Sequence, residues 1–160
     1  MKDSQLEEVM NKMIIEFSKT LELFGLTPLE SRLFVYLYLT DDPLTLDEMS
    51  EALGKSKTSM STSIRSLFDL NLVTRVWKKG VRKDLYEANS HLYKSFSTIY
   101  FSKWLDSTNH HKDTLMEIRN EIDSPKKATI SKEKEKLNKK LDEIINFHVQ
   151  IEGLFNNMKQ

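Results

Sequence analysis

The chain has 160 residues, no net charge and no cysteine, and 30% of its residues are charged. This length suits one ordinary domain with helical extensions, and the missing cysteines exclude a disulfide framework, a zinc–cysteine site and a cysteine nucleophile. The N-terminus lacks the apolar segment of a signal peptide, and no apolar run reaches the ~20 residues of a membrane span. The sequence therefore predicts a cytoplasmic protein without a membrane partner.

Two helices are predicted at the N-terminal end. The first covers residues 4–24 and ends at Gly25, since apolar residues recur there at three- and four-residue steps. Its stripe consists of Leu6, Val9 or Met10, Met13, Phe17, Leu21 and Phe24. Thr27, Pro28 and Glu30 form the N-cap, first position and capping-box acid of the second helix. Its predicted buried face is Leu29, Leu33, Tyr36 and Leu37.

A helix-turn-helix pattern follows the break at Asp41-Asp42-Pro43. Thr45 and Glu48 form a second capping box, and Gly54 supplies the turn after a short helix. Ser56 is the predicted N-cap of the next helix. The short helix runs through Met49, Ala52 and Leu53, and the predicted inner face of the helix after Ser56 is Met60, Ile64, Leu67 and Phe68.

A β-hairpin is predicted next. Residues 72–77 alternate as a strand does, and residues 84–88 can pair back against them. The connecting tip carries four cations around Gly80. A helix-turn-helix followed by a basic hairpin is the pattern of a winged helix.

The C-terminal half is predicted to be helical. Asn89 or Ser90 caps a long helix that ends at Ser124-Pro125, with a seam of Tyr93, Phe96, Tyr100, Trp104, His111, Leu115, Ile118 and Ile122. Residues 130–158 carry a heptad seam of Leu137, Leu141, Ile144, His148, Ile151, Phe155 and Met158. The predicted fold class is mainly α with a small β-hairpin, a winged helix-turn-helix with long N- and C-terminal dimerisation helices.

Charge is unevenly distributed along this neutral chain. Residues 53–84 hold eight basic and two acidic side chains, a net charge of +6, whereas residues 41–51 hold only acidic charges. Clustered cations on one segment can hold phosphate even when the whole protein is neutral.

The helix after Ser56 has short side chains on its non-core face, which would let it approach base edges in a major groove. The DNA-binding candidates on the turn and this helix are Lys55, Ser56, Lys57, Thr58, Ser59, Ser61, Thr62, Ser63 and Arg65. Those on the hairpin tip, for the minor groove or flanking phosphates, are Lys78, Lys79, Arg82 and Lys83. Each feature alone could be a solvated surface, but their order along the chain favours double-stranded DNA as the partner.

No catalytic constellation is recognisable, so the sequence predicts neither an enzyme nor a cofactor. His110 and His111 are adjacent on a helix and point about 100° apart, so they cannot share a metal from one face. No metal site is predicted.

The segments SKTSMSTSIRSL, RVWKKGVRK and LYEA resemble the winged-helix domain of the MarR superfamily and, more narrowly, the GbsR-type regulators of glycine betaine synthesis. The resemblance covers Leu44 to Ala88, extends loosely to the flanking helices and adds little beyond Pro125. It implies a homodimeric transcriptional repressor, with the DNA-reading helix at residues 57–69 and the wing at residues 77–86. Some members respond to choline or glycine betaine and control osmoprotectant uptake or synthesis genes.

Three functional segments are accordingly expected: a dimerisation helix at 1–25, a DNA-binding domain at 26–89, and helices at 90–160 for dimerisation and an effector pocket. The alternative for the terminal helices is pairing within one chain. The effector-binding candidates, whose ring faces would suit a quaternary ammonium ion, are Trp77, Tyr86, Tyr93, Phe96, Tyr100 and Trp104. The alternatives are that these rings are core, and that the winged helix is a protein–protein assembly module without DNA readout.

Overall fold

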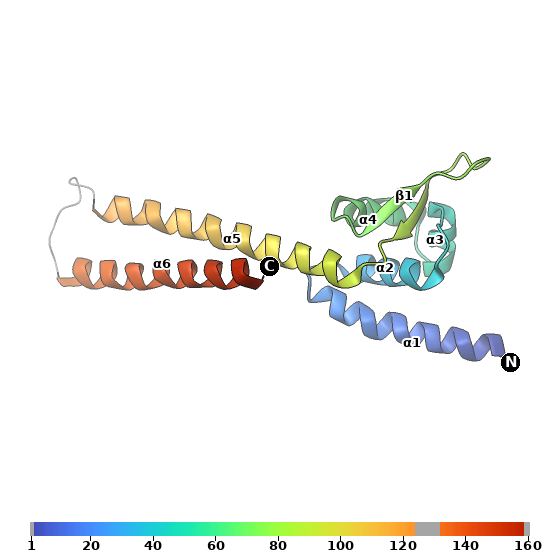
Figure 1. The fold of residues 1–160 in the computed structure, drawn as a ribbon, viewed down its shortest axis with the longest axis horizontal. Helices are drawn as coiled ribbons and strands as arrows, with labels where there is room; N and C mark the ends of the chain where they lie inside the picture. The colour runs from blue at the N-terminus through green and yellow to red at the C-terminus, as the bar shows by residue number, and fades with distance from the viewer. Residues whose placement is uncertain (1, 124–131, 159–160) are drawn as a thin grey trace. The chain divides into compact units, whose positions relative to one another are not determined.

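The structure, a computed structural model, describes residues 2–123 and 132–158. Its elements, in order, are α1 (Lys2–Glu22), α2 (Pro28–Thr40), α3 (Leu46–Leu53), α4 (Lys57–Asp69), β1 (Val73–Val76), β2 (Leu85–Ala88), α5 (Leu92–Ile122) and α6 (Lys132–Met158). The chain divides into two compact units, Met1–Ile99 and Tyr100–Gln160, so α5 contributes to both. Figure 1 labels these elements.

The first unit is a winged helix-turn-helix, as the sequence predicted. Helices α2, α3 and α4 surround an apolar core, and the β1–β2 hairpin projects beside α4 (Figure 1). The side chains that are almost completely buried in this core include Leu33, Phe34, Val35, Met49, Met60, Leu67 and Leu72. Helix α1 packs on α2, which completes the unit.

The predicted starts of α2 and α3 are confirmed by their caps. The Glu30 N–H donates to Thr27 Oγ1 at 3.1 Å while the Thr27 N–H donates to Glu30 Oε1 at 2.8 Å. Thr45 and Glu48 form the same reciprocal pair at the start of α3. Each pair satisfies backbone donors that a helix start leaves open, and therefore fixes where α2 and α3 begin.

The hairpin is joined to the helices through its backbone. Strands β1 and β2 are antiparallel, with Val73 opposite Ala88 and Val76 opposite Leu85. Leu44, in the segment between α2 and α3, exchanges two backbone hydrogen bonds of 2.9 Å with Tyr86. The segment before α3 thus extends the small sheet by one residue, a pairing absent from the sequence prediction.

Helix α1 packs on the core with only part of its predicted stripe. Ile14, Ser18 and Leu21 are buried and Met10 and Phe17 pack beside them, whereas Leu6, Val9 and Met13 are 68%, 51% and 48% exposed. Met10, Phe17 and Leu21 of the stripe therefore reach the core together with Ile14, which the predicted stripe did not include. The apolar side chains of Leu6, Val9 and Met13 face outward in the single chain.

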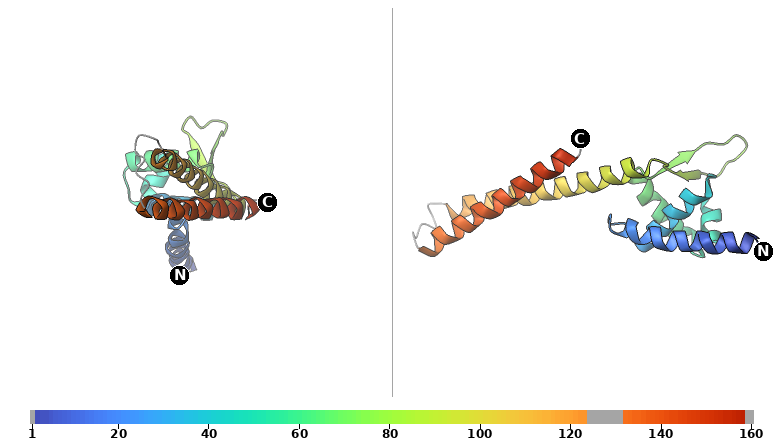
Figure 2. Two further views of the ribbon diagram at one scale, coloured as in Figure 1. Left: turned by 90° about the vertical axis from the view of Figure 1, so that its left-hand side faces the viewer. Right: turned by 60° about the horizontal axis from the view of Figure 1, so that its bottom comes forward.

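The second unit is an antiparallel helical hairpin of α5 and α6, which run side by side in Figures 1 and 2. Lys112 Nζ and Glu152 Oε2, 2.7 Å apart, and the Arg119–Asp142 ion pair link the two helices. The rings of Tyr100, Phe101 and Trp104 all contact Phe155.

The predicted heptad seam of α6 is wrong as a single seam, because it merges two. The side toward α5 contains Leu141, Ile145 and Phe155, all buried, together with the half-buried His148. A second stripe, three residues away and so rotated by ~60°, contains Ile144, Phe147, Ile151, Leu154 and Met158. Except for the half-buried Ile151, its residues are exposed, and Leu137 from the predicted seam is exposed as well. Both stripes have heptad spacing, so periodicity alone could not separate them.

The seam predicted for α5 also changes. Leu105 and Thr108 are its buried residues in the second unit, whereas the predicted His111 and Ile118 are exposed. Tyr93, which the same seam included, is 85% exposed in the first unit. The predicted stop at Ser124-Pro125 and the predicted start of the last helix at Ile130 lie outside the described residues.

Glu30 connects the start of α2 to α4. Partial burial raises the pKa of its carboxyl, but hydrogen bonds with the Ser66 side chain and with the Thr27 backbone and side chain outweigh burial, so its pKa lies below the ordinary 4.5. A lowered pKa in the folded state means that the charged form stabilises the fold. This contribution is complete above the ordinary value and is lost as pH falls through the lowered one.

We expect Glu30→Ala to lower the free energy of unfolding by about 1 kcal/mol at pH 7, the usual scale of a lost helix cap. The deficit should shrink as the pH is lowered from 7 to 3, because the wild-type carboxyl then begins to be protonated and loses part of its advantage. Urea unfolding of the variant and the wild type at both pH values measures this difference in the free energy of unfolding. Glu30→Gln keeps the hydrogen bonds without the charge, so its smaller deficit serves as the control. An Ala deficit that is equal at both pH values would contradict the role of the charge.

Candidate nucleic-acid interface

Helix α4 presents one polar face to the solvent because its other face is held in the core. Met60, Ile64 and Leu67 are buried at 0–2% exposure. The candidates that remain exposed on α4 are Lys57, Thr58, Thr62 and Arg65, with Ser59 and Ser61 half-buried. Lys55, in the turn before α4, is exposed as well.

Ser63 does not belong to the polar face. Its side chain is only 7% exposed on the buried side of α4, so its place among the DNA-binding candidates is withdrawn. A small hydroxyl-bearing residue fits either side of a helix, and the sequence pattern could not distinguish them. Conversely, Phe68 was expected to face inward and is 46% exposed.

Some candidate hydroxyls already have partners in the helix. Ser56 Oγ accepts from the Ser59 N–H at 3.1 Å as the predicted N-cap, and donates to Ser59 Oγ at 2.9 Å. The Thr62 hydroxyl donates to the Thr58 carbonyl at 3.1 Å. The cap therefore gives Ser56 a structural role, and any DNA contact through its hydroxyl would compete with that role.

The hairpin tip extends from β1 and β2 as a cationic loop. Lys78, Lys79, Arg82 and Lys83 are all exposed, and Gly80 takes the left-handed conformation at φ 85° that the turn requires. At the base of the loop, Arg75 Nη2 lies 2.7 Å from Asp84 Oδ1 across the two strands. This ion pair raises the pKa of Arg75 and ties the strands together where the loop begins.

An acidic residue joins the wing to α4. One oxygen of the Asp47 carboxylate lies 2.5 Å from Lys83 Nζ, and the other lies 3.3 Å from Lys57 Nζ. These two ammonium groups, Lys83 first and Lys57 second, hold the pKa of Asp47 below its ordinary value. Sequence analysis missed Asp47 because nothing local indicates a contact that spans 36 residues.

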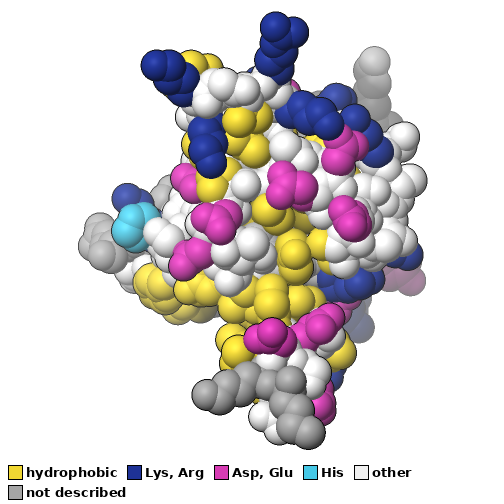
Figure 3. Space-filling model, turned by 90° about the vertical axis from the view of Figure 1, so that its right-hand side faces the viewer, with side chains coloured by type: hydrophobic (Ala, Val, Ile, Leu, Met, Phe, Trp, Pro, Cys, Tyr) yellow, Lys and Arg dark blue, Asp and Glu magenta, His cyan; other side chains and the backbone are white. Residues whose placement is uncertain are grey.

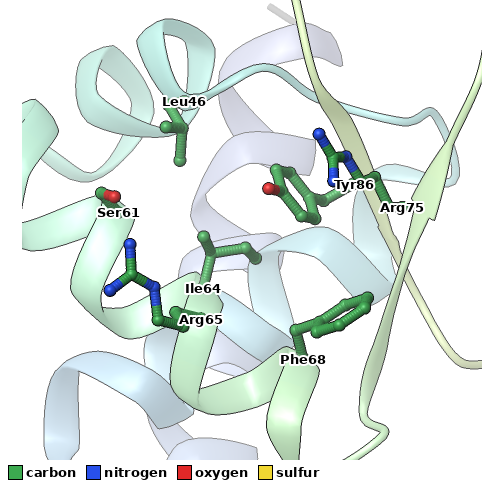
Figure 4. A pocket seen from close by; sticks show the side chains of 7 residues that line it. All are labelled: Leu46, Ser61, Ile64, Arg65, Phe68, Arg75 and Tyr86. Atoms are coloured by element: carbon green, nitrogen blue, oxygen red, sulfur yellow. The ribbon is translucent and has the colours of Figure 1, made fainter.

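A groove of about 200 Å³ lies between α4 and the hairpin. Figure 4 shows Ser61 and Arg65 on the α4 side, and Arg75 and Tyr86 on the hairpin side. Leu46, Ile64 and Phe68 complete its lining. The groove therefore has an apolar floor with a guanidinium on either side, and its position explains the exposure of Phe68.

The six predicted effector-binding rings differ in burial and lie in different surroundings. Phe96 is 5% exposed, and its ring packs edge-on against Phe24 and Phe34, so it belongs to the core of the first unit and is withdrawn as a ligand contact. Trp77 and Tyr93 are 81% and 85% exposed, and Tyr86 lines the groove. Tyr100 and Trp104 pack on Phe101 and Phe155 in the second unit.

Nothing in the described part of the chain forms a group of three or more His, Asp or Glu side chains that could hold a metal ion. The rings of His111 and His148 meet edge-on with centroids 6.5 Å apart, and His148 Nδ1 is 2.8 Å from the Ile144 carbonyl oxygen. Two histidines on facing helices are too few ligands for a structural metal centre.

Comparison with known proteins identifies the family. Residues 21–94 match the family model "Sugar-specific transcriptional regulator TrmB". The chain is 32% identical over 140 residues to the "Putative HTH-type transcriptional regulator YvaV" of Bacillus subtilis (strain 168), covering 87% of this chain and 79% of that protein. The chain belongs to the winged helix-turn-helix transcriptional regulators.

Two further similarities agree with this assignment. The HTH-type transcriptional repressor GbsR of the same Bacillus strain is 35% identical over 99 residues, which cover 62% of this chain and 54% of GbsR. A solved structure described as a transcriptional regulator has the same fold, with a TM-score of 0.54 at 18% identity over 92% of this chain and 98% of that one. The protein is thus a DNA-binding regulator and not an enzyme.

The described helices of this regulator include none that is both long and apolar enough to cross a membrane. Its wing carries four exposed cations, and Figure 3 shows a group of Lys and Arg side chains at one edge, with acidic side chains beside them. The polar face of α4, the wing and the groove between them form a continuous candidate interface for DNA.

Proposed function

We propose that the protein is a transcriptional repressor that binds double-stranded DNA sequence-specifically as a homodimer. The α4 side chains Lys57, Thr58, Ser61, Thr62 and Arg65 face the major groove. The wing cations contact the flanking backbone or minor groove. The repressor role is supported by the similarity to GbsR, which carries that function in its name.

The observation that carries this proposal is the arrangement of two polar surfaces around one groove. Arg65 comes from α4 and Arg75 from β1, and both line the groove between helix and hairpin. The exposed cationic tip continues the same hairpin. Short polar side chains on a helix beside a basic hairpin suit a duplex, because base edges and phosphates then lie within reach of one rigid body. An assembly module without DNA readout would not need this concentration of cations.

We expect Lys79→Ala combined with Arg82→Ala to weaken binding to all duplex sequences alike. Each lost phosphate contact should lower the slope of log affinity against log salt by about 0.9, and the pair by roughly twice that. Fluorescence anisotropy with mixed-sequence duplex DNA at several salt concentrations measures this slope. Lys12→Ala with Lys19→Ala removes the same charge from α1 and should leave the slope unchanged. Equal slopes for the wing variant and wild type would remove the wing from the interface.

Dimerisation is supported by the outer stripe of α6. Phe147 and Leu154 are 57% and 53% exposed, and they continue a heptad pattern with Ile144, Ile151 and Met158. A contiguous apolar stripe of this kind marks a surface that another helix covers. A second copy of this chain is the proposed occupant, because two copies of α4 could then enter major grooves about 34 Å apart.

The expected effect of Phe147→Glu or Leu154→Glu is dissociation into monomers, because like charges would then face each other across the two-fold interface. Sedimentation velocity measures the change. Asn146→Glu places the same charge on the exposed side of α6 away from both stripes, and should stay dimeric. If both stripe variants sediment as wild type does, α6 does not form the interface.

The proposed effector is a quaternary ammonium compound such as choline or glycine betaine, and the proposed target genes are those for osmoprotectant uptake or synthesis. The support is the resemblance to GbsR-type regulators. With Phe96 assigned to the core, the exposed ring among the predicted candidates in the second unit is Trp104, which is 48% exposed and 5.7 Å from Tyr100 between ring centroids. Ring faces attract such cations electrostatically.

Choline should quench the fluorescence of a Trp77→Phe variant saturably, since Trp104 is then its one remaining tryptophan, and should release the wild-type protein from DNA. Potassium chloride at equal ionic strength is the control for screening. Quenching of the complementary Trp104→Phe variant instead would move the effector site to the wing. Absence of quenching and of DNA release at millimolar choline would contradict the proposed effector.

A further inference from the structure

Asp47 lies in the first turn of α3, and its two carboxylate oxygens take one lysine each. Lys57 is the first residue of α4, and Lys83 belongs to the returning side of the wing. Their ammonium nitrogens lie 3.3 and 2.5 Å from Oδ1 and Oδ2. Side chains from three separate elements therefore meet at one carboxylate on the face proposed to bind DNA.

Stability does not explain this arrangement. The side chains of Lys57, Asp47 and Lys83 are 62%, 44% and 66% exposed. Ion pairs in such exposed positions are screened by salt and add little to the stability of a fold. The local start of α3 is already fixed by Thr45 and Glu48.

The geometry suits a phosphate. A backbone phosphate presents two anionic oxygens, and each can take one ammonium group, as the Asp47 carboxylate does here. Lysine binds phosphate as a point charge and needs no planar partner. We propose that Lys57 and Lys83 form a binding site for one DNA backbone phosphate, and that Asp47 occupies this site in the DNA-free protein.

This inference rests on the proposed function, and it has a consequence for affinity. DNA must exchange the Asp47 carboxylate for its own phosphate before Lys57 and Lys83 can contribute. The lowered pKa of Asp47 keeps this competitor charged at neutral pH. Asp47 therefore weakens binding to every duplex, and it reduces the salt dependence because its single negative charge already offsets one of the two lysine charges.

The test is Asp47→Asn, which keeps the shape and removes the charge. We expect affinity for mixed-sequence duplex DNA to rise about 10-fold at low salt, and the slope of log affinity against log salt to steepen by about 1, as for one more phosphate neutralised. The matched control is Glu51→Gln, an exposed acid on the same helix that forms no ion pair within the described residues. It should change affinity less than about 2-fold, the scale of a screened long-range charge. Binding by Asp47→Asn that is equal to or weaker than wild type would overturn the proposal.

A second comparison separates the phosphate site from general charge repulsion. In a background of Lys57→Gln and Lys83→Gln, adding Asp47→Asn should give no gain in affinity, since there are no lysines to release. A gain of the same size in that background would overturn the shared site. If the wild-type protein shows no salt-dependent binding to DNA, the proposed function itself is rejected. Circular dichroism melts confirm that each variant is folded.

Discussion

The orientation of α4 depends on the burial of one narrow apolar face. Met60, Ile64 and Leu67 are removed from solvent against the rest of the first unit. Side chains of this size each contribute roughly 1.5–3 kcal/mol when they are fully buried. Rotating α4 by one residue, about 100°, would expose them and bury polar side chains in their place. Core packing therefore selects the residues available to DNA, and explains why Ser63 is lost from that set while Arg65 is kept.

Contacts between segments that are distant in the sequence also position the elements of the candidate DNA interface. Arg75 and Asp84 hold the base of the wing, Asp47 joins the wing to α4, and Glu30 joins the start of α2 to Ser66. None of these groups is fully buried, so each is weak by itself. Together these contacts hold the side chains and the wing in place on helices that the apolar core has already positioned.

Local signals in the sequence were sufficient for the starts of α2, α3 and α4, the turn at Gly54 and the hairpin. A capping box such as Thr45 with Glu48 acts within four residues, so its physics is visible in the sequence. It was harder to predict which face of each helix is buried. The outer and inner stripes of α6 have the same spacing, and only their surroundings decide which one is buried. Phe96 and Trp104 look equivalent as aromatic residues of one helix, yet Phe24 and Phe34 enclose the first, while the second is half exposed.

The pairing of Leu44 with Tyr86 has a mechanical consequence. Two backbone hydrogen bonds clamp the strand that leaves the wing to the segment that enters α3. Since these bonds resist tilting of the hairpin against the helices, the hairpin and the helix-turn-helix should move as one rigid body. In the proposed dimer, regulation would then alter the distance between the two DNA-binding units, while the contacts that each unit makes with the duplex stayed the same.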